Sequence, residues 1–95
     1  VVRLPARDGV VPLESFANAI DDETLLVATS HVNYLNGARI DAKALIDLAH
    51  SRGAWALVDE FQAAGTLGHT AAQLGADFAV GGTFKYLLGT AGMAY

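Results

Sequence analysis

The chain has 95 residues, of which 53% are hydrophobic and 17% charged, and its formal net charge is −4 at pH 7. It contains no cysteine, which excludes disulfides, thiolate metal sites and a cysteine nucleophile within these residues. No apolar stretch reaches the roughly 18 residues of a membrane span, and no basic run indicates nucleic acid or an anionic membrane. This composition is apolar for a small unit with a large relative surface. We therefore expect a cytoplasmic slab whose faces are covered by further chain or by a second subunit.

Short apolar runs alternate with helical patterns along the chain, which is typical of βα units around a parallel sheet. The runs at 25–29 and 55–58 are almost continuously apolar, as in strands that are buried on both faces. There is no linker and no internal repeat, so the pattern predicts one α/β domain. The expected strands lie at 1–4, 25–29, 55–58, 78–80 and 92–95, the last of them only begun.

Three amphipathic helices are predicted from apolar spacing and from residues that favour helix ends. The first follows Pro12, and the second begins after Asp41, a good N-cap residue. The third opens with Thr70 and Gln73 in capping-box spacing and closes at Gly75.

Polar residues follow three of the predicted strands, at the point where each strand ends. In open α/β sheets, ligands bind beyond the carboxyl ends of the strands. We therefore expect the functional site at this edge of the sheet. The polar segments are Ser30-His31 with Asn33, Asp59 with Gln62, and Thr83 with Lys85.

Asp59 and Lys85 follow apolar strands that are consecutive in the chain. A carboxylate at a buried strand end needs a cation or a hydrogen-bond donor, although Asp59 could also cap the following turn. An amine in apolar surroundings loses its proton readily and can then form a Schiff base with an aldehyde, although a loop lysine can also extend into water. A pyridoxal ring could lie between the two side chains, with Lys85 on the aldehyde carbon and Asp59 on the ring nitrogen.

A second interpretation takes Asp59 and Glu60 as the magnesium-binding strand end of a nucleotide-binding α/β domain. Such domains also use a phosphate loop of the form GxxxxGK[ST], and these residues contain none. His50 and His69 have no metal-ligand spacing with any partner, and we expect both at the surface.

Four stretches, in this order, make the interpretation specific. They are Ser30-His31-Val32-Asn33-Tyr34 with Gly37, Val58-Asp59-Glu60-Phe61-Gln62-Ala63-Ala64-Gly65, Leu74-Gly75-Ala76-Asp77-Phe78, and Thr83-Phe84-Lys85-Tyr86-Leu87-Leu88-Gly89. Together they resemble the class V aminotransferase family of fold-type I pyridoxal-phosphate enzymes, which includes cysteine desulfurases and kynureninases. The resemblance implies a three-layer α/β sandwich with a mainly parallel sheet. The chain would then be an internal part of the large domain, truncated at both ends.

The resemblance also implies roles for individual residues. Lys85 would be the catalytic residue that carries pyridoxal 5'-phosphate as a Schiff base, and Asp59 would pair with the pyridine nitrogen. Gln62 would hydrogen-bond the phenolic oxygen of the ring. Thr83 would offer its hydroxyl to the phosphate.

Three further positions matter for the pocket. His31 and Asn33 would help to shape the cofactor or substrate pocket, or else order the turn before Gly37. Phe84 departs from the family pattern, because relatives carry His or Tyr there and both can hydrogen-bond the phosphate.

The implied function is a pyridoxal-phosphate-dependent enzyme, a lyase or a transaminase, that acts on an amino acid. The stretches around Asn33 and Lys85 favour kynureninase-like members, whereas the spacing of Asp59 and Gln62 favours desulfurases and aminotransferases. A homodimer is implied as well. The family's Gly-rich phosphate turn and its substrate-binding arginine fall outside this segment, so an inactive fragment is a third interpretation. We expect that residues 1–95 alone do not turn over substrate.

Overall fold

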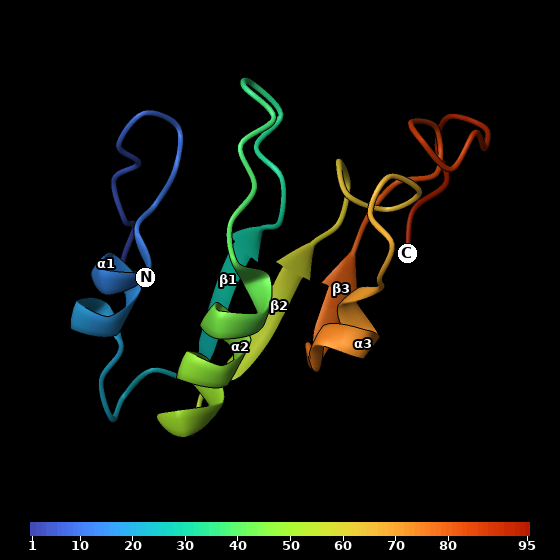
Figure 1. Ribbon diagram of the computed structural model, residues 1–95. Helices are drawn as coiled ribbons and strands as arrows, with labels where there is room; N and C mark the ends of the chain where they lie inside the picture. Colours follow the sequence, from blue (N-terminus) through green and yellow to red (C-terminus); the bar gives the residue numbers. More distant parts are fainter.

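The computed structural model describes all of residues 1–95, which form helices and strands in alternation (Figure 1). In chain order they are α1 (Leu13–Ala19), β1 (Leu26–Ser30), α2 (Ala42–Ser51), β2 (Trp55–Asp59), α3 (Ala71–Leu74) and β3 (Phe78–Val80). The three predicted helices and the three central strands are confirmed, with bounds that differ by one residue at β1 and β2.

The three strands form one parallel sheet in the order β1-β2-β3, as the alternating pattern predicted. Asp59, the last residue of β2, is the register partner of Ser30 in β1 and of Val80 in β3. The three strands therefore end together, and the segments that follow them leave from one edge of the sheet.

The two outer strand predictions are wrong. Residues 1–4 have no regular structure, because no strand of this sheet pairs with their backbone. Residues 92–95 contribute only an isolated antiparallel bridge between Gly82 and Ala94, supported by reciprocal backbone hydrogen bonds between Gly81 and Tyr95 of 3.1 and 3.0 Å.

All three helices lie on one face of the sheet, and the core fills the space between them (Figure 1). Val27, Ala56 and Val58 project toward this face from β1 and β2 and are buried. Leu45 and Ile46 of α2 pack against them as the apolar spacing predicted. These residues thus contain the sheet and one helical layer of the sandwich.

The opposite face of the sheet is open and apolar. The register partners Leu26 and Trp55 are 45% and 60% exposed, and Phe78 and Val80 of β3 are exposed beside them. Within residues 1–95, the strands predicted to be buried on both faces are therefore buried on one. Covering of the open face by further chain or by a second subunit stays a prediction.

The predicted helix ends are present. The Asp41 carboxylate accepts a hydrogen bond from the backbone N–H of Ala44, so it caps α2. Thr70 and Gln73 form a reciprocal capping box at α3. Gly75 ends α3 with φ of 90°, a left-handed conformation that glycine adopts without steric strain.

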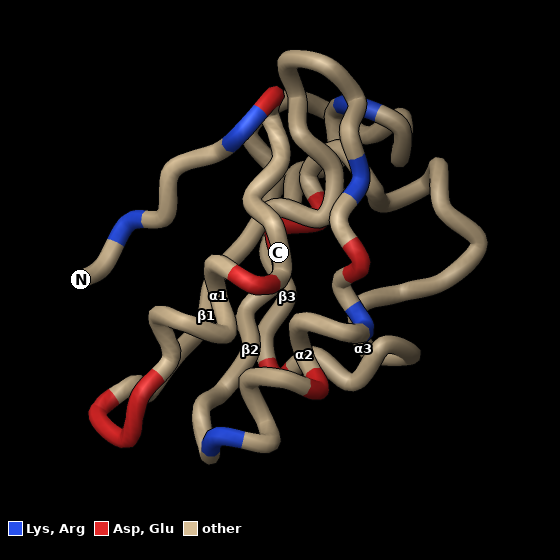
Figure 2. Tube along the Cα trace, turned by 60° about the vertical axis from the view of Figure 1, so that its left-hand side comes forward, with Lys and Arg blue, Asp and Glu red and all other residues tan.

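Charged residues are distributed along the trace without a basic cluster. The six lysine and arginine residues lie apart from one another, and acidic residues gather in the turn between α1 and β1 (Figure 2). None of the helices has the length and apolarity that crossing a membrane requires.

Hydrogen bonds of Asp77 join α2 to the sheet, at the edge away from the functional residues. Asp77, just before β3, accepts hydrogen bonds from the backbone N–H of Ala56 and from His50 Nε2, both at 2.8 Å. These two bonds, the backbone bond first, lower the pKa of the Asp77 carboxyl from its ordinary value of 3.8.

This lowered pKa predicts acid sensitivity of the fold. As the pH falls below 3.8, the unfolded chain takes up the proton before folded Asp77 does, so stability present above 3.8 is lost on acidification. We expect Asp77→Asn to lower the free energy of unfolding of the full-length protein at neutral pH. The difference in this free energy between variant and wild type should decrease below pH 3.8. Urea unfolding from neutral pH to below pH 3.8 measures this difference, with a variant of the exposed Asp47, Asp47→Asn, as the control. A difference that does not change with pH would contradict the role given to Asp77.

Candidate functional site

The segments that follow the strands enclose a cavity of about 400 Å³. Its wall is formed by the ends of β1 and β2, the turns after them, the loop that carries Lys85 and part of the N-terminal segment. Asp59 and Lys85 are the two charged residues that line it, and Gln62 and Asn33 line it as well. The structure therefore brings four of the predicted site residues around one space, at the predicted edge of the sheet.

Asp59 is held in a fixed orientation at the wall of this cavity. Its Oδ1 accepts a 2.8 Å hydrogen bond from the backbone N–H of Phe61, and its Oδ2 accepts a 3.1 Å bond from the Ser30 hydroxyl. The carboxylate thus caps the turn and also lines the cavity, whereas its pairing with a cofactor stays a prediction. Its charge also reaches the phenol of Tyr95, whose pKa is raised by burial first and then by Glu60 and Asp59.

Lys85 is half-buried beside an aromatic wall. Its Nζ lies 5.1 Å from the centroid of the Phe61 ring, and Phe84 packs edge-on against the same ring at 5.4 Å. Phe61 in turn packs on the backbone of Gly82, where a Cβ would collide with the ring.

Asn33 orders the chain around the cavity. Its Nδ2 donates to the carbonyl of Gly9 at 2.7 Å, and its Oδ1 accepts from the backbone N–H of Leu35 at 2.8 Å. The local ordering that the sequence suggested is thus present, and the same side chain lines the cavity. Gln62 lines it from the turn after β2.

His31 and Thr83 lie elsewhere. His31 is 2% exposed and its Nδ1 lies 2.9 Å from Glu60 Oε1, away from the residues that line the cavity. The Thr83 hydroxyl donates to the carbonyl of Thr90 at 3.0 Å and is not in the cavity wall. Contact of these two residues with a cofactor stays a prediction.

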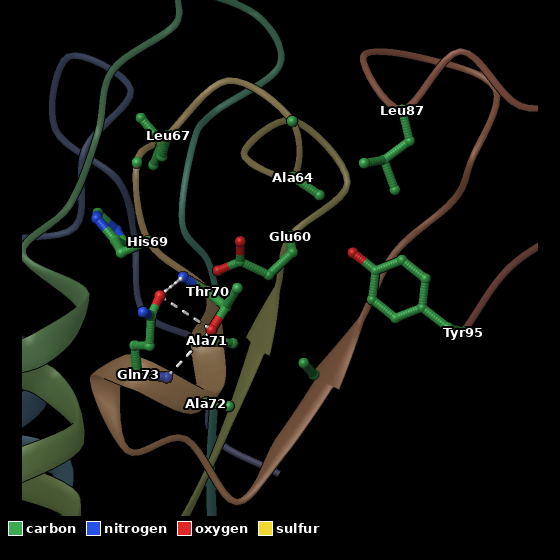
Figure 3. A pocket seen from close by; sticks show the side chains of 13 residues that line it. Glu60, Ala64, Leu67, His69, Thr70, Ala71, Ala72, Gln73, Leu87 and Tyr95 are labelled. Carbon is green, nitrogen blue, oxygen red and sulfur yellow. Dashed lines mark hydrogen bonds between the residues drawn. The ribbon is translucent and has the colours of Figure 1, made fainter.

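A second cavity, of about 480 Å³, lies on the other side of β2, next to α3 (Figure 3). Glu60 points into it and Tyr95 faces Glu60 across it (Figure 3). Asp59 and Glu60 thus serve different cavities, and no group of three His, Cys, Asp or Glu residues is placed to hold a metal ion. This arrangement does not support the magnesium interpretation.

The sequence did not reveal the surroundings of His69. Its ring lies 5.3 Å from that of His31, and its Nε2 is buried without a hydrogen-bond partner. We expected a surface histidine, and the structure shows a half-buried one whose ring packs beside that of His31. His50, in contrast, is exposed as expected.

Residues 1–94 match the family described as aminotransferase class-V. The chain belongs to the class V aminotransferase family. It is 39% identical over 97% of its length to the uncharacterized aminotransferase YcbU of Bacillus subtilis, and 43% identical over 83% to a kynureninase of Pseudomonas fluorescens.

Two solved structures share this fold. An apo cysteine desulfurase from Thermococcus onnurineus NA1 superposes on 96% of the chain with a TM-score of 0.82 and 27% identity. The Escherichia coli cysteine desulfurase CsdA covers 98% with a TM-score of 0.85 and shares the fold at 24% identity. The predicted fold-type I class is therefore confirmed. The chain spans 25% of YcbU and 19% of the kynureninase, about a quarter or less of these relatives.

Proposed function

We propose that this chain is the cofactor-bearing part of a pyridoxal-phosphate-dependent enzyme that acts on an amino acid. The observation that carries the proposal is the single cavity around which Lys85, Asp59 and Gln62 meet. A lysine amine, a carboxylate and a neutral amide are the three groups that the aldehyde carbon, the ring nitrogen and the phenolic oxygen of this cofactor require.

The residues present fit the ring of the cofactor. Lys85 would hold the cofactor covalently, Asp59 would keep the ring nitrogen protonated, and Gln62 would bind the phenolic oxygen. When bound, the ring supplies an electron sink for the bonds of the substrate α-carbon. Lys85 Nζ would then be the group that moves the α-proton, next to the Phe61 ring, whose centroid lies 5.1 Å away.

These residues offer few hydrogen-bond donors to the phosphate of the cofactor. Phe84 has no donor, and the Thr83 hydroxyl is bonded to the carbonyl of Thr90. A missing hydrogen bond to a charged group weakens binding by about 1.5–3 kcal/mol. The phosphate would therefore depend on donors from further chain or from a second subunit, and we expect residues 1–95 alone to be inactive.

The reaction class is a lyase or a transaminase. The named relatives include an aminotransferase, kynureninases and cysteine desulfurases, which supports an amino-acid substrate without selecting among the three reactions. We further propose a cytoplasmic homodimer, in which the open apolar face or the cavity rim is covered by the rest of the protein.

One experiment tests the proposal directly. The full-length protein, incubated with pyridoxal 5'-phosphate, should become coloured and should carry a borohydride-stable label on the peptide that contains Lys85. Peptide mapping by mass spectrometry locates the label. A colourless protein, or a label on Lys43 instead, would overturn the assignment.

A further inference from the structure

A buried polar pair lies directly behind the Asp59 carboxylate. His31 Nδ1 and Glu60 Oε1 are 2.9 Å apart, and the two residues are 2% and 4% exposed. They are the residues that follow Ser30 and Asp59, the last register pair of β1 and β2.

His31, Glu60 and Asp59 belong to one continuous ladder of backbone hydrogen bonds. The N–H of His31 donates to the carbonyl of Asp59 at 3.0 Å, and the N–H of Glu60 donates to the carbonyl of Val80 at 2.8 Å. Successive side chains of an extended segment point to opposite sides. Ser30 and Asp59 therefore face the cavity of Lys85, whereas Glu60 faces the second cavity (Figure 3).

The surroundings hold His31 from three directions. Its ring packs on that of His69 at 5.3 Å, its carbonyl accepts from the N–H of Ile40 at 3.1 Å, and its Nδ1 meets Glu60. These side-chain and backbone contacts hold the ends of β1 and β2 in place, next to the Asp59 carboxylate.

Stability alone does not account for such a pair. Removing an acid from water is unfavourable, and well-packed apolar residues at such positions are often as stabilising as the ion pair they replace. A hydrogen-bonded pair fixes the relative position of two strand ends, which two apolar side chains do not.

We infer that His31 and Glu60 are positioning residues that set the place of the Asp59 carboxylate against the ring nitrogen of the cofactor. The inference rests on the function proposed above for Asp59. The pair acts through the ends of β1 and β2: its side-chain bond joins the residue after Ser30 to the residue after Asp59, next to the backbone bond from the His31 N–H to the Asp59 carbonyl.

The test compares two ligands that differ only at the atom Asp59 serves. The full-length apo-protein is titrated with pyridoxal 5'-phosphate and with its 1-deaza analogue, which has CH in place of the ring nitrogen. The ratio of the two dissociation constants reports contact with Asp59, because a general loss of structure weakens both ligands alike. Unfolding midpoints are measured in parallel.

The main variant replaces both partners, His31→Leu with Glu60→Leu, so that no buried charge is left unpaired. We expect its unfolding midpoint to stay near that of wild type while its preference for pyridoxal 5'-phosphate over the analogue falls about tenfold, the equivalent of one charge-assisted bond. Glu60→Gln, which can keep a hydrogen bond to His31, should retain the preference. A double variant with the wild-type preference would overturn the inference.

Two further outcomes are informative. Wild-type protein that binds both ligands equally would overturn the role of Asp59 and this inference with it, whereas a preference in wild type that persists in the double variant overturns the inference alone. If the double variant does not fold, His31→Asn and His31→Ala replace it. Asparagine can donate near the position of Nδ1 and should retain the preference that alanine loses, and equal preferences would overturn the inference.

Discussion

Lys85→Ala in the full-length protein is expected to abolish covalent attachment of pyridoxal 5'-phosphate and to reduce turnover by about 10²- to 10⁴-fold, the contribution of a positioned acid–base group. The reason is that Lys85 is the one amine in the cavity wall, which contains no other cationic side chain, and it lies beside Phe61. The absorbance of the bound cofactor and steady-state rates measure the two effects.

The chain offers a matched control for this variant. Lys43, the other lysine, lies on α2 and pairs with Asp47 at 2.6 Å in an exposed i,i+4 ion pair. Such pairs contribute about 0–1 kcal/mol. Lys43→Ala should therefore leave cofactor attachment and rate unchanged. Equal loss in both variants, or full activity in Lys85→Ala, would remove Lys85 from the proposed function.

Asp59→Asn should leave the cofactor attached but slow exchange of the substrate α-proton with solvent. Asparagine can still accept the hydrogen bond from the N–H of Phe61, so the turn cap remains while the charge is lost. Losing a charge-assisted bond to the ring nitrogen weakens the interaction by about 1.5–3 kcal/mol, which corresponds to about 10- to 150-fold in rate. Proton exchange followed by NMR measures this.

Asp59→Ala separates the two roles of the carboxylate. It removes the cap as well as the charge, so we expect it to lower the unfolding midpoint and to slow exchange, whereas Asp59→Asn slows exchange only. Unchanged exchange in both variants would show that Asp59 is a turn cap without a role at the cofactor. The same exchange assay on Asp47→Asn provides the background value.

The site follows the class V pattern at the residues proposed to bind the cofactor ring and departs from it at Phe84, near the proposed phosphate position. The ring-binding residues Lys85, Asp59 and Gln62 are together, which supports a cofactor-dependent enzyme. Phe84 has instead joined the aromatic wall by packing on Phe61. The place of a phosphate donor is thus taken by a residue that packs on Phe61, the ring next to Lys85.

The sequence by itself determined the local structure and the family. Helix ends at Asp41, Thr70 and Gly75 depend on side chains that bond backbone groups three residues away or less, or on one backbone conformation, and all three are present. The apolar runs of β1, β2 and β3 were recognisable as well, because each is a short apolar run that is bounded by polar or turn residues. The spacing of polar residues after these strands placed the site at the correct edge.

Only the tertiary structure decided which side of the sheet each residue serves. His31 and Asp59 both follow apolar runs, but the register of β1 with β2 turns Ser30 and Asp59 toward Lys85 and turns His31 and Glu60 away. A shift of one residue would exchange the two sets, and register is decided by pairing between strands about 30 residues apart. The same long-range packing placed the His69 ring beside His31 and left 1–4 without a strand partner, and neither can be read from neighbouring residues.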